Sequence, residues 1–141
     1  GEPLAQKRCL ELLRQLCDAG YEVSLETSGA LDIAGVDPRV SRVLDIKTPD
    51  SAEVERNLWG NLPLLTPRDQ VKFVICSRAD FDWAKGIVAE HRLHAVCDVL
   101  FSPSASQLPA RELADWIVAE RVPVRFQMQL HKLLWNDEPG R

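Results

Sequence analysis

Residues 70–76, QVKFVIC, form the clearest β-strand in this 141-residue sequence. The segment is rich in β-branched and aromatic residues, which favour strands. On either side of it, strands and helices are predicted to alternate: a helix over 3–19, strands over 21–28 and 40–46, a helix over 79–91, a strand over 96–101, a helix over 109–121 and a strand over 124–130. Such alternation indicates an α/β fold with a parallel sheet and right-handed crossovers.

The composition fits a single folded domain that binds a small molecule. The chain is 45% hydrophobic, which suffices for a buried core at this length. No run reaches the about 18 apolar residues of a membrane span. Seventeen Lys and Arg against 21 Asp and Glu leave a net charge of −4, so the basic excess that nucleic-acid binding needs is missing. We therefore expect no nucleic-acid and no membrane partner.

The four cysteines, Cys9, Cys17, Cys76 and Cys97, include no C-x-x-C pair. A zinc ribbon or a complete iron–sulfur loop within these residues is therefore not expected. We interpret the cysteines as reduced packing residues. This favours a reducing compartment, and we expect a cytoplasmic protein.

Polar or charged residues follow nearly every predicted strand, where parallel sheets and barrels place their sites. The segments are Gly1-Glu2-Pro3, Glu26-Thr27-Ser28-Gly29, Asp45-Ile46-Lys47-Thr48, Ser77-Arg78, Ser102-Pro103-Ser104 and Gln129-Leu130-His131-Lys132. The sequence contains no G-x-S-x-G, Walker or G-x-G-x-x-G motif. A cofactor bound through several scattered strand ends is therefore predicted.

Each of these segments also has an ordinary structural interpretation. Gly1-Glu2-Pro3 either lets a ligand approach the backbone or forms a plain turn before a helix. Glu26 can accept two hydrogen bonds from a ribose diol, or it can be a solvated acid. Asp45 and Lys47 share one face of a strand, so they pair with each other or with a ligand. His131 suits a polar heterocycle, or it is simply partly exposed.

Taken together, these segments resemble the 7-carboxy-7-deazaguanine synthase family of radical S-adenosylmethionine enzymes, over essentially the whole chain. Gly1-Glu2-Pro3 matches the end of the family's Gly-Gly-Glu-Pro motif, and Glu26-Thr27-Ser28-Gly29 matches its E-T-S-G. Asp45-Ile46-Lys47 stands where the family has a three-residue segment ending in Lys. Met128-Gln129-Leu130-His131-Lys132 resembles the family's terminal M-Q-T-H-K.

The resemblance implies a partial (β/α)6 barrel of the radical S-adenosylmethionine type, formed by residues 1–141 as one domain. We expect the chain to be a fragment that lacks the first strands. The missing part would hold the C-x3-C-x2-C loop of a [4Fe–4S] cluster and a Mg²⁺ ligand. Without that part, the fragment is expected to be inactive.

The activity implied is a carbon–nitrogen lyase reaction of queuosine biosynthesis. In the family, an electron from the cluster cleaves S-adenosylmethionine to a 5′-deoxyadenosyl radical. This radical takes hydrogen from 6-carboxy-5,6,7,8-tetrahydropterin, and the ring contracts with loss of ammonia to 7-carboxy-7-deazaguanine. A reductant such as flavodoxin and a homodimer are also implied.

Carried onto this sequence, the resemblance places Gly1 at the methionine end of the cofactor and Glu26 at its ribose. The other implied cofactor-binding residues are Asp45, Ile46, Lys47, Ser102, Pro103, Ser104 and Ala105. Gln129 and His131 would face the pterin, and no catalytic residue or metal ligand is assigned within this chain. The chain departs from the family at Ser102, where Gln is frequent, and in its extension through residues 135–141.

Three alternatives remain open at this stage. A glycyl-radical-enzyme activating enzyme shares the Gly-Gly-Glu-Pro turn. A Schiff-base aldolase would use Lys47 as its nucleophile. A non-catalytic ligand-binding or dimerisation module would use apolar surface such as Trp59 and Trp135.

Overall fold

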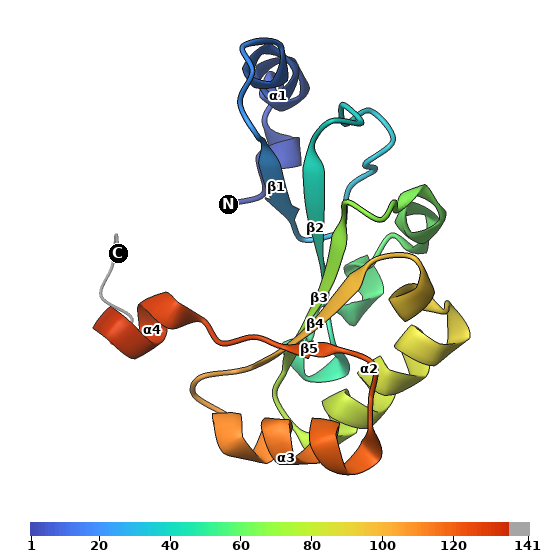
Figure 1. The fold of residues 1–141 in the computed structure, drawn as a ribbon, viewed down its shortest axis with the longest axis vertical. Coiled ribbons are helices and arrows are strands. Elements are labelled where there is room, and N and C mark those ends of the chain that lie inside the picture. The colour runs from blue at the N-terminus through green and yellow to red at the C-terminus, as the bar shows by residue number, and fades with distance from the viewer. Residues whose placement is uncertain (136–141) are drawn as a thin grey trace.

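The chain forms an α/β fold around one five-stranded sheet (Figure 1). The structure is a computed structural model that describes residues 1–135, without the side chains of residues 131–133. The strands are β1 (Ser24–Thr27), β2 (Ser41–Ile46), β3 (Gln70–Ile75), β4 (Asp98–Pro103) and β5 (Arg125–Phe126). They lie in chain order and every neighbouring pair is parallel. The predicted parallel sheet is therefore confirmed.

Side chains alternate along the strands and give the sheet an apolar face and a polar face. On the apolar face, Ile46 lies opposite Phe73, and Phe73 lies opposite Phe101. On the polar face, Asp45 lies opposite Lys72, one position away in each strand. The apolar face therefore supplies the core, and the polar face carries the charges.

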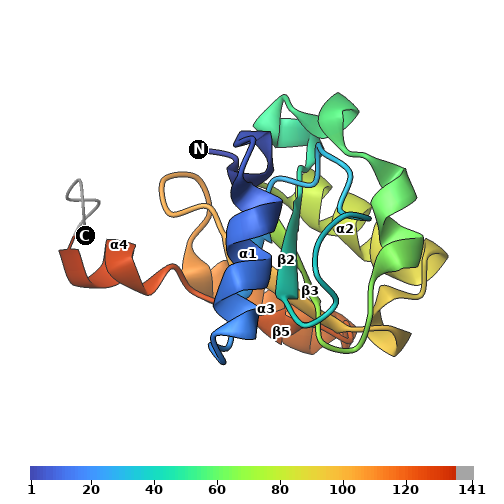
Figure 2. The ribbon, with the colours of Figure 1, turned by 90° about the horizontal axis from the view of Figure 1, so that it is seen from above.

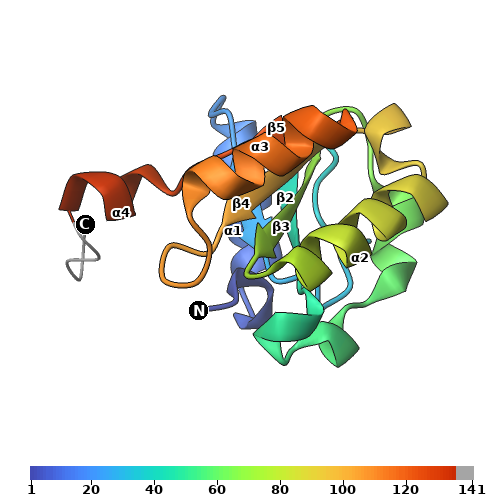
Figure 3. The same ribbon diagram turned by 90° about the horizontal axis from the view of Figure 1, so that it is seen from below.

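Two helices cover the apolar face, α2 (Arg78–Glu90) and α3 (Ala110–Glu120) (Figure 3). Phe101 of the sheet meets Phe81 of α2 with 5.9 Å between ring centroids, and Phe81 in turn meets Trp116 of α3 at 5.5 Å. Phe73 and Phe101 pack edge to face at 5.5 Å, an arrangement that aromatic rings prefer. These aromatic contacts join sheet and helices into one core.

The first helix is shorter than predicted. A 3-10 turn, η1 (Pro3–Ala5), comes first, and the α-helix α1 begins only at Cys9 and ends at Asp18. The helix predicted to start at residue 3 is wrong because the Glu2 carboxylate ties η1 to the end of β1. Figure 1 shows α1 beside β1, and in Figure 2 α1 lies in front of the sheet. Leu13 of α1 belongs to the same core as Leu25 of β1. Gly20 follows the helix with a φ of 88°, a left-handed backbone conformation that glycine adopts readily.

The segment between β2 and β3 consists of 3-10 turns. They are η2 (Pro49–Ser51), η3 (Val54–Arg56) and η4 (Trp59–Leu64), and a further turn, η5 (Leu93–Ala95), follows α2. Buried Asn61 holds this segment to the loop after β1, because its amide donates to the carbonyls of Gly29 and Leu31 and accepts from the amide of Ile33. The loop after β1 is thereby fixed next to the ends of the strands.

The last predicted strand, over 124–130, is also wrong in its extent. Only Arg125 and Phe126 pair with β4, and the amide of Gln127 adds one bond to the carbonyl of Phe101 at 2.9 Å. Because β5 is an edge strand and β4 ends at Pro103, which has no N–H to donate, the pairing cannot continue. The chain then leaves the sheet and forms α4 (Leu130–Trp135). Within residues 1–135, no helix is long and apolar enough to cross a bilayer.

Candidate functional site

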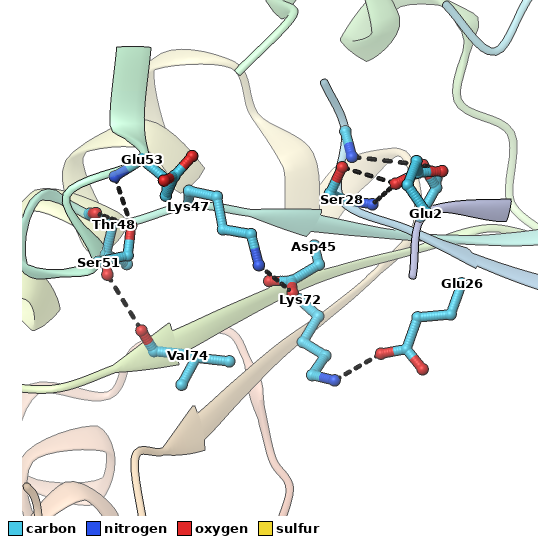
Figure 4. Close-up of polar contacts among 12 residues, drawn as sticks. Glu2, Glu26, Ser28, Asp45, Lys47, Thr48, Ser51, Glu53, Lys72 and Val74 are labelled. Atoms are coloured by element: carbon cyan, nitrogen blue, oxygen red, sulfur yellow. Dashed lines mark hydrogen bonds and ion pairs between the residues drawn. The ribbon is translucent and has the colours of Figure 1, made fainter. Parts of the chain in front are cut away.

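The polar face of the sheet carries two ion pairs side by side (Figure 4). Lys72 of β3 donates from Nζ to Glu26 Oε1 of β1 at 2.6 Å. Lys47, directly after β2, donates from Nζ to Asp45 Oδ2 at 2.7 Å. The prediction that Asp45 and Lys47 share a face is confirmed, and they pair with each other. This pairing occupies the Lys47 ammonium and speaks against its use as a Schiff-base nucleophile.

The two acids of the polar face, Glu26 and Asp45, differ in how far their side chains are exposed. The Glu26 side chain is 61% exposed, whereas that of Asp45 is 17% exposed. The second oxygen of Asp45, Oδ1, is buried and has no hydrogen-bond partner among the described residues. A buried acceptor without a partner is costly, so this oxygen is poised for a donor supplied by a ligand.

Ile46 does not belong to this surface, although the sequence places it between two residues that do. Its side chain is 3% exposed and is part of the hydrophobic core. The strand alternation that turns Asp45 and Lys47 toward the polar face turns Ile46 away from it. The Ile46 side chain therefore does not line this surface, and the predicted cofactor contact of Ile46 stays a prediction for its backbone.

The start of the chain is fastened to the end of β1 by Glu2. Its carboxylate accepts from Thr27 Oγ1 at 2.8 Å, from the Ser28 amide at 2.7 Å and from Ser28 Oγ at 2.6 Å. It also accepts from the Leu4 amide at 3.1 Å. Burial alone would raise the pKa of Glu2, but the hydrogen bonds from Ser28, Thr27 and Leu4 outweigh it and lower the pKa. Glu2 therefore stays ionised and holds Gly1 beside the end of β1.

Three open hollows follow the polar face and the strand ends. The β1 hollow, of about 420 Å³, is lined by Gly1, Glu2, Pro3, Glu26, Thr27, Ser28 and Asp45. The sheet hollow, of about 370 Å³, is lined by Glu26, Val43, Gln70, Lys72, Leu100, Gln127, Met128, Gln129 and Leu130. The β4 hollow, of about 220 Å³, is lined by Pro103, Ala105, Leu108, Pro109, Ala110, Met128 and Gln129. Glu26 joins the first two, and Gln129 joins the last two.

These hollows bring together most, but not all, of the predicted site residues. Gly1, Glu26 and Asp45 line one hollow, as predicted for a cofactor site. Lys47 reaches the site only through its pair with Asp45. The side chain of His131 lies outside the part of the chain that the structure describes. Within residues 1–135 these residues therefore line three open hollows and do not surround one enclosed cavity.

The segment after β4 is buried at its start and more open beyond. Ser102 is 0% exposed, and its Oγ has no hydrogen-bond partner among the described residues. The Ser104 amide donates to the carbonyl of Ile75 at 2.8 Å, which holds the turn against β3. Pro103 and Ala105 line the β4 hollow. The predicted set Ser102–Ala105 thus lies at one strand end, with one unsatisfied hydroxyl.

The polar residues after β3 have a structural use. Ser77 caps α2 by accepting from the Asp80 amide at 3.2 Å. Arg78 pairs on the surface with Asp82 at 3.0 Å and with Glu120 of α3. These contacts stabilise the starts and packing of the helices, and neither Ser77 nor Arg78 lines any of the three hollows described above.

Three of the four cysteines, Cys9, Cys17 and Cys97, pack against the hydrophobic core. All four are free thiols of intermediate exposure. Burial raises the pKa of Cys97 to about 11 and also raises the pKa of Cys76. Within the described residues, no group of three or more His, Cys, Asp or Glu side chains is arranged to hold a metal ion.

Comparison with known proteins identifies the family. A 7-carboxy-7-deazaguanine synthase from Chlorobaculum tepidum is 43% identical over 141 residues, which cover 98% of this chain and 64% of that protein. The synthase of Koribacter versatilis is 36% identical over 152 positions, covering 98% of this chain and 67% of the relative. This chain belongs to the 7-carboxy-7-deazaguanine synthase family.

A further member of the 7-carboxy-7-deazaguanine synthase family is matched over a similar share of its length. The synthase of Thermoplasma acidophilum is 32% identical and is matched over 66% of its length. The chain thus spans between one half and two-thirds of the length of the curated relatives that it matches. No protein-family model matches the chain.

Sequence reasoning missed three residues that shape the site in this member of the 7-carboxy-7-deazaguanine synthase family. Lys72 lies inside the strand used to predict the fold, and only the side-chain alternation within QVKFVIC could have placed it on the polar face. Glu2 was noted only as part of a turn. Asp80, fully buried at the start of α2, accepts from Thr48 Oγ1 at 2.9 Å and from the Asp50 amide at 3.0 Å. It thereby fixes the segment directly after Lys47.

Proposed function

We propose that the full-length protein is a radical S-adenosylmethionine lyase that forms 7-carboxy-7-deazaguanine from 6-carboxy-5,6,7,8-tetrahydropterin with loss of ammonia. One observation carries the proposal. Nearly the whole chain aligns with proteins named 7-carboxy-7-deazaguanine synthase, and the aligned chain brings Gly1, Glu26 and Asp45 to one hollow. The product would serve queuosine biosynthesis.

The sheet supports a partial (β/α)6 barrel, of which residues 1–141 form part of one domain. The proposal is supported by five parallel strands in chain order with α2 and α3 on one face, which is what a barrel wall would require. In a closed wall of this kind, the polar face becomes the interior. Glu26, Asp45, Lys72 and Ser102 would then line the inside of the barrel, near the strand ends where barrel sites lie.

The residues on the polar face fit an adenosyl cofactor. Glu26 presents an exposed carboxylate, which suits the two hydroxyls of a ribose. Asp45 Oδ1 and Ser102 Oγ are buried and lack hydrogen-bond partners within residues 1–135, so both can bond to polar groups of a ligand. S-adenosylmethionine, when bound and reduced, supplies the radical that the chemistry requires.

The roles of the chain's own residues follow from these positions. Gly1 would bind the methionine end of the cofactor and Glu26 its ribose, while Asp45 and Lys47 stay paired and line the pocket. Ser102, Pro103, Ser104 and Ala105 would bound the pocket at the end of β4. Gln129 and His131 would bind the pterin. Among those of these side chains that the structure describes, none forms a nucleophile–base pair, which agrees with a reaction in which the protein mainly positions its ligands.

The described residues do not fit a metal centre, so no step is assigned to a metal held by them. We propose that the ligands of the [4Fe–4S] cluster and of Mg²⁺ lie elsewhere in the full-length protein. A reductant such as flavodoxin would supply the electron, and the protein would act in the cytoplasm as a homodimer.

The activity is tested on the full-length protein, prepared and assayed without oxygen. With 6-carboxy-5,6,7,8-tetrahydropterin, S-adenosylmethionine and a reductant, we expect 7-carboxy-7-deazaguanine and ammonia in equal amounts, measured by chromatography. Release of 5′-deoxyadenosine with no change in the pterin would contradict the proposed substrate.

The division of the site is tested by isothermal titration of the full-length protein with each ligand. E26A is expected to weaken S-adenosylmethionine binding, and H131A to weaken mainly pterin binding. Glu22, an exposed glutamate shortly before β1, provides the control variant E22A, which should bind both ligands as the wild type does. Equal losses for both ligands in E26A and H131A would refute the division.

A further inference from the structure

Lys72 has no role in the proposed function, although it forms one of the two ion pairs on the polar face. We propose that Lys72 is a positioning residue that holds the Glu26 carboxylate in place to receive a ribose. The inference rests on the proposed function, because it concerns the adenosyl cofactor assigned to the same surface. The ligand chemistry that it recognises is the cis-diol of a ribonucleoside.

The first observation is that Lys72 pairs with Glu26 and not with the nearer strand's Asp45. In the sheet register, Lys72 lies directly opposite Asp45 on the neighbouring strand. Its ammonium nevertheless reaches across β2 to Glu26 of β1, at 2.6 Å from Oε1. Asp45 is already paired with Lys47 at 2.7 Å. The Asp45–Lys47 pair thus leaves Glu26 as the acid that completes the ion pair of Lys72.

The difference in burial between the partners is the second observation. The Lys72 side chain is 15% exposed, whereas the Glu26 side chain is 61% exposed. A largely buried ammonium has little freedom to move and is costly to leave without a counter-charge. Lys72 therefore acts as the fixed partner, and Glu26 is the residue whose position is set by the pair.

The free oxygen of Glu26 is the third observation. Oε1 accepts from Lys72, while Oε2 accepts no hydrogen bond from any residue that the structure describes. An exposed glutamate on its own samples several rotamers, and a ligand that binds it must restrict them. Because Lys72 restricts them beforehand, Glu26 presents Oε2 to a ligand at a lower entropic cost. The pair also leaves the carboxylate with a counter-charge when a ribose displaces water from it.

The experiment is isothermal titration of the full-length protein with S-adenosylmethionine and with its 2′-deoxyribose analogue. The variants are K72M, K72R, E26Q and the double variant K72M/E26Q. K85M is the matched control, since Lys85 also pairs with a glutamate, Glu120, but on the outer surface between α2 and α3. Urea unfolding checks that each variant folds, and K72Q replaces K72M in the test if K72M does not fold.

We expect K72M to weaken S-adenosylmethionine binding by about tenfold, the loss of roughly one charge-assisted hydrogen bond. The wild type should prefer the ribose cofactor over the 2′-deoxy analogue, and K72M should lose most of that preference. In the E26Q background, K72M should have little further effect, because Lys72 acts through Glu26. K72R should recover part of the affinity, and K85M should bind as the wild type does.

Two results would overturn the inference alone: wild-type affinity in K72M while E26Q binds weakly, or independent additive losses from K72M and E26Q. Wild-type affinity in E26Q would overturn the ribose role of Glu26 and, with it, the role of Lys72. No binding of S-adenosylmethionine by the wild type would overturn the proposed function as well as the inference. Comparing the S-adenosylmethionine affinities of K72M, E26Q and the wild type therefore tells a failure of this inference from a failure of the proposed function.

Discussion

The two faces of the sheet are built from the same strands but serve opposite purposes. On the apolar face, Phe73 and Phe101 are fully buried beneath α2 and α3. At the adjacent positions of the same strands, the polar face carries Lys72, just before Phe73, and the unsatisfied Ser102 hydroxyl, just after Phe101. Burial of apolar surface explains the first face completely. Paired charges and an unsatisfied hydroxyl add little to stability, so the second face is best explained by what it binds.

The largest effect is expected on the apolar face. F101A removes a fully buried ring that contacts Phe73 and Phe81, and it should lower the free energy of unfolding by about 3–5 kcal/mol. Urea denaturation of the full-length protein measures the change. F126A is the control, because Phe126 lies opposite Phe101 in register but is half exposed, and it should cost much less. Equal losses from the two variants would show that the apolar face is not the stabilising one.

The next effect concerns a buried ion pair at the start of β2. Asp69 is buried, and it accepts from the Arg42 guanidinium at 2.6 Å. D69N should cost about 3 kcal/mol, because it leaves a buried guanidinium without its counter-charge. The same urea denaturation at neutral pH measures the loss. A smaller loss of unfolding free energy in D69N than in a surface variant such as K85M would show that the Asp69–Arg42 pair does not stabilise the fold.

The pH dependence of stability follows from the same pair. Burial alone would raise the pKa of Asp69, but hydrogen bonds from Arg42 and Thr66 outweigh it and lower the pKa below 3.8. A carboxyl whose pKa is lowered in the folded state stabilises the protein at pH values above its unfolded-state pKa. This contribution is lost as the pH falls through the folded-state pKa. The wild type should therefore lose stability below a pH of about 4, and D69N should lose less. If the free energy of unfolding fell equally with pH in the wild type and in D69N, Asp69 would not be the source of the acid sensitivity.

Substitutions on the polar face should change the affinity for the ligand more than the stability of the fold. Replacing Asp45 and Lys47 together, as D45L/K47M, should change the free energy of unfolding by less than about 2 kcal/mol in either direction, because apolar pairs often replace partly buried ion pairs at no cost. The affinity for S-adenosylmethionine should fall about tenfold or more. Urea denaturation and titration of the same preparation measure both quantities. A large loss of stability with unchanged affinity would reverse the comparison between the faces.

The smallest effect is expected where the chain start meets β1. E2Q weakens hydrogen bonds to Thr27 and Ser28 on a partly exposed carboxylate and should cost about 1 kcal/mol or less. Its effect should be local, seen as faster hydrogen exchange at the Ser28 amide while the Phe101 amide stays protected. Exchange that speeds up equally at both amides would show that Glu2 supports the whole fold.

The sequence predicted what depends on local pattern. The strand QVKFVIC and the two helices after it follow from composition and periodicity, and the structure confirms them within a few residues. The late start of α1 depends on bonds from Glu2 to residues 25 and 26 positions away. The short β5 depends on where β4 ends. Neither can be inferred from local pattern alone.

The part of the candidate site that lies at the strand ends could be predicted, because the ends of parallel strands meet at one edge of the sheet. Gly1, Glu26 and Asp45 come together as the motif positions indicate. The side chain of Ile46, in contrast, belongs to the core, because neighbouring residues of a strand point to opposite faces. Lys72 was missed because its partner lies 46 residues away.

A crystal structure of the full-length protein with S-adenosylmethionine tests the central claim most directly. We predict density for the adenosyl group on the polar face, with both ribose hydroxyls within hydrogen-bond distance of the Glu26 carboxylate and Lys72 still bound to the other side of that carboxylate. Density for the cofactor on any other surface, with Glu26 facing solvent, would contradict the account.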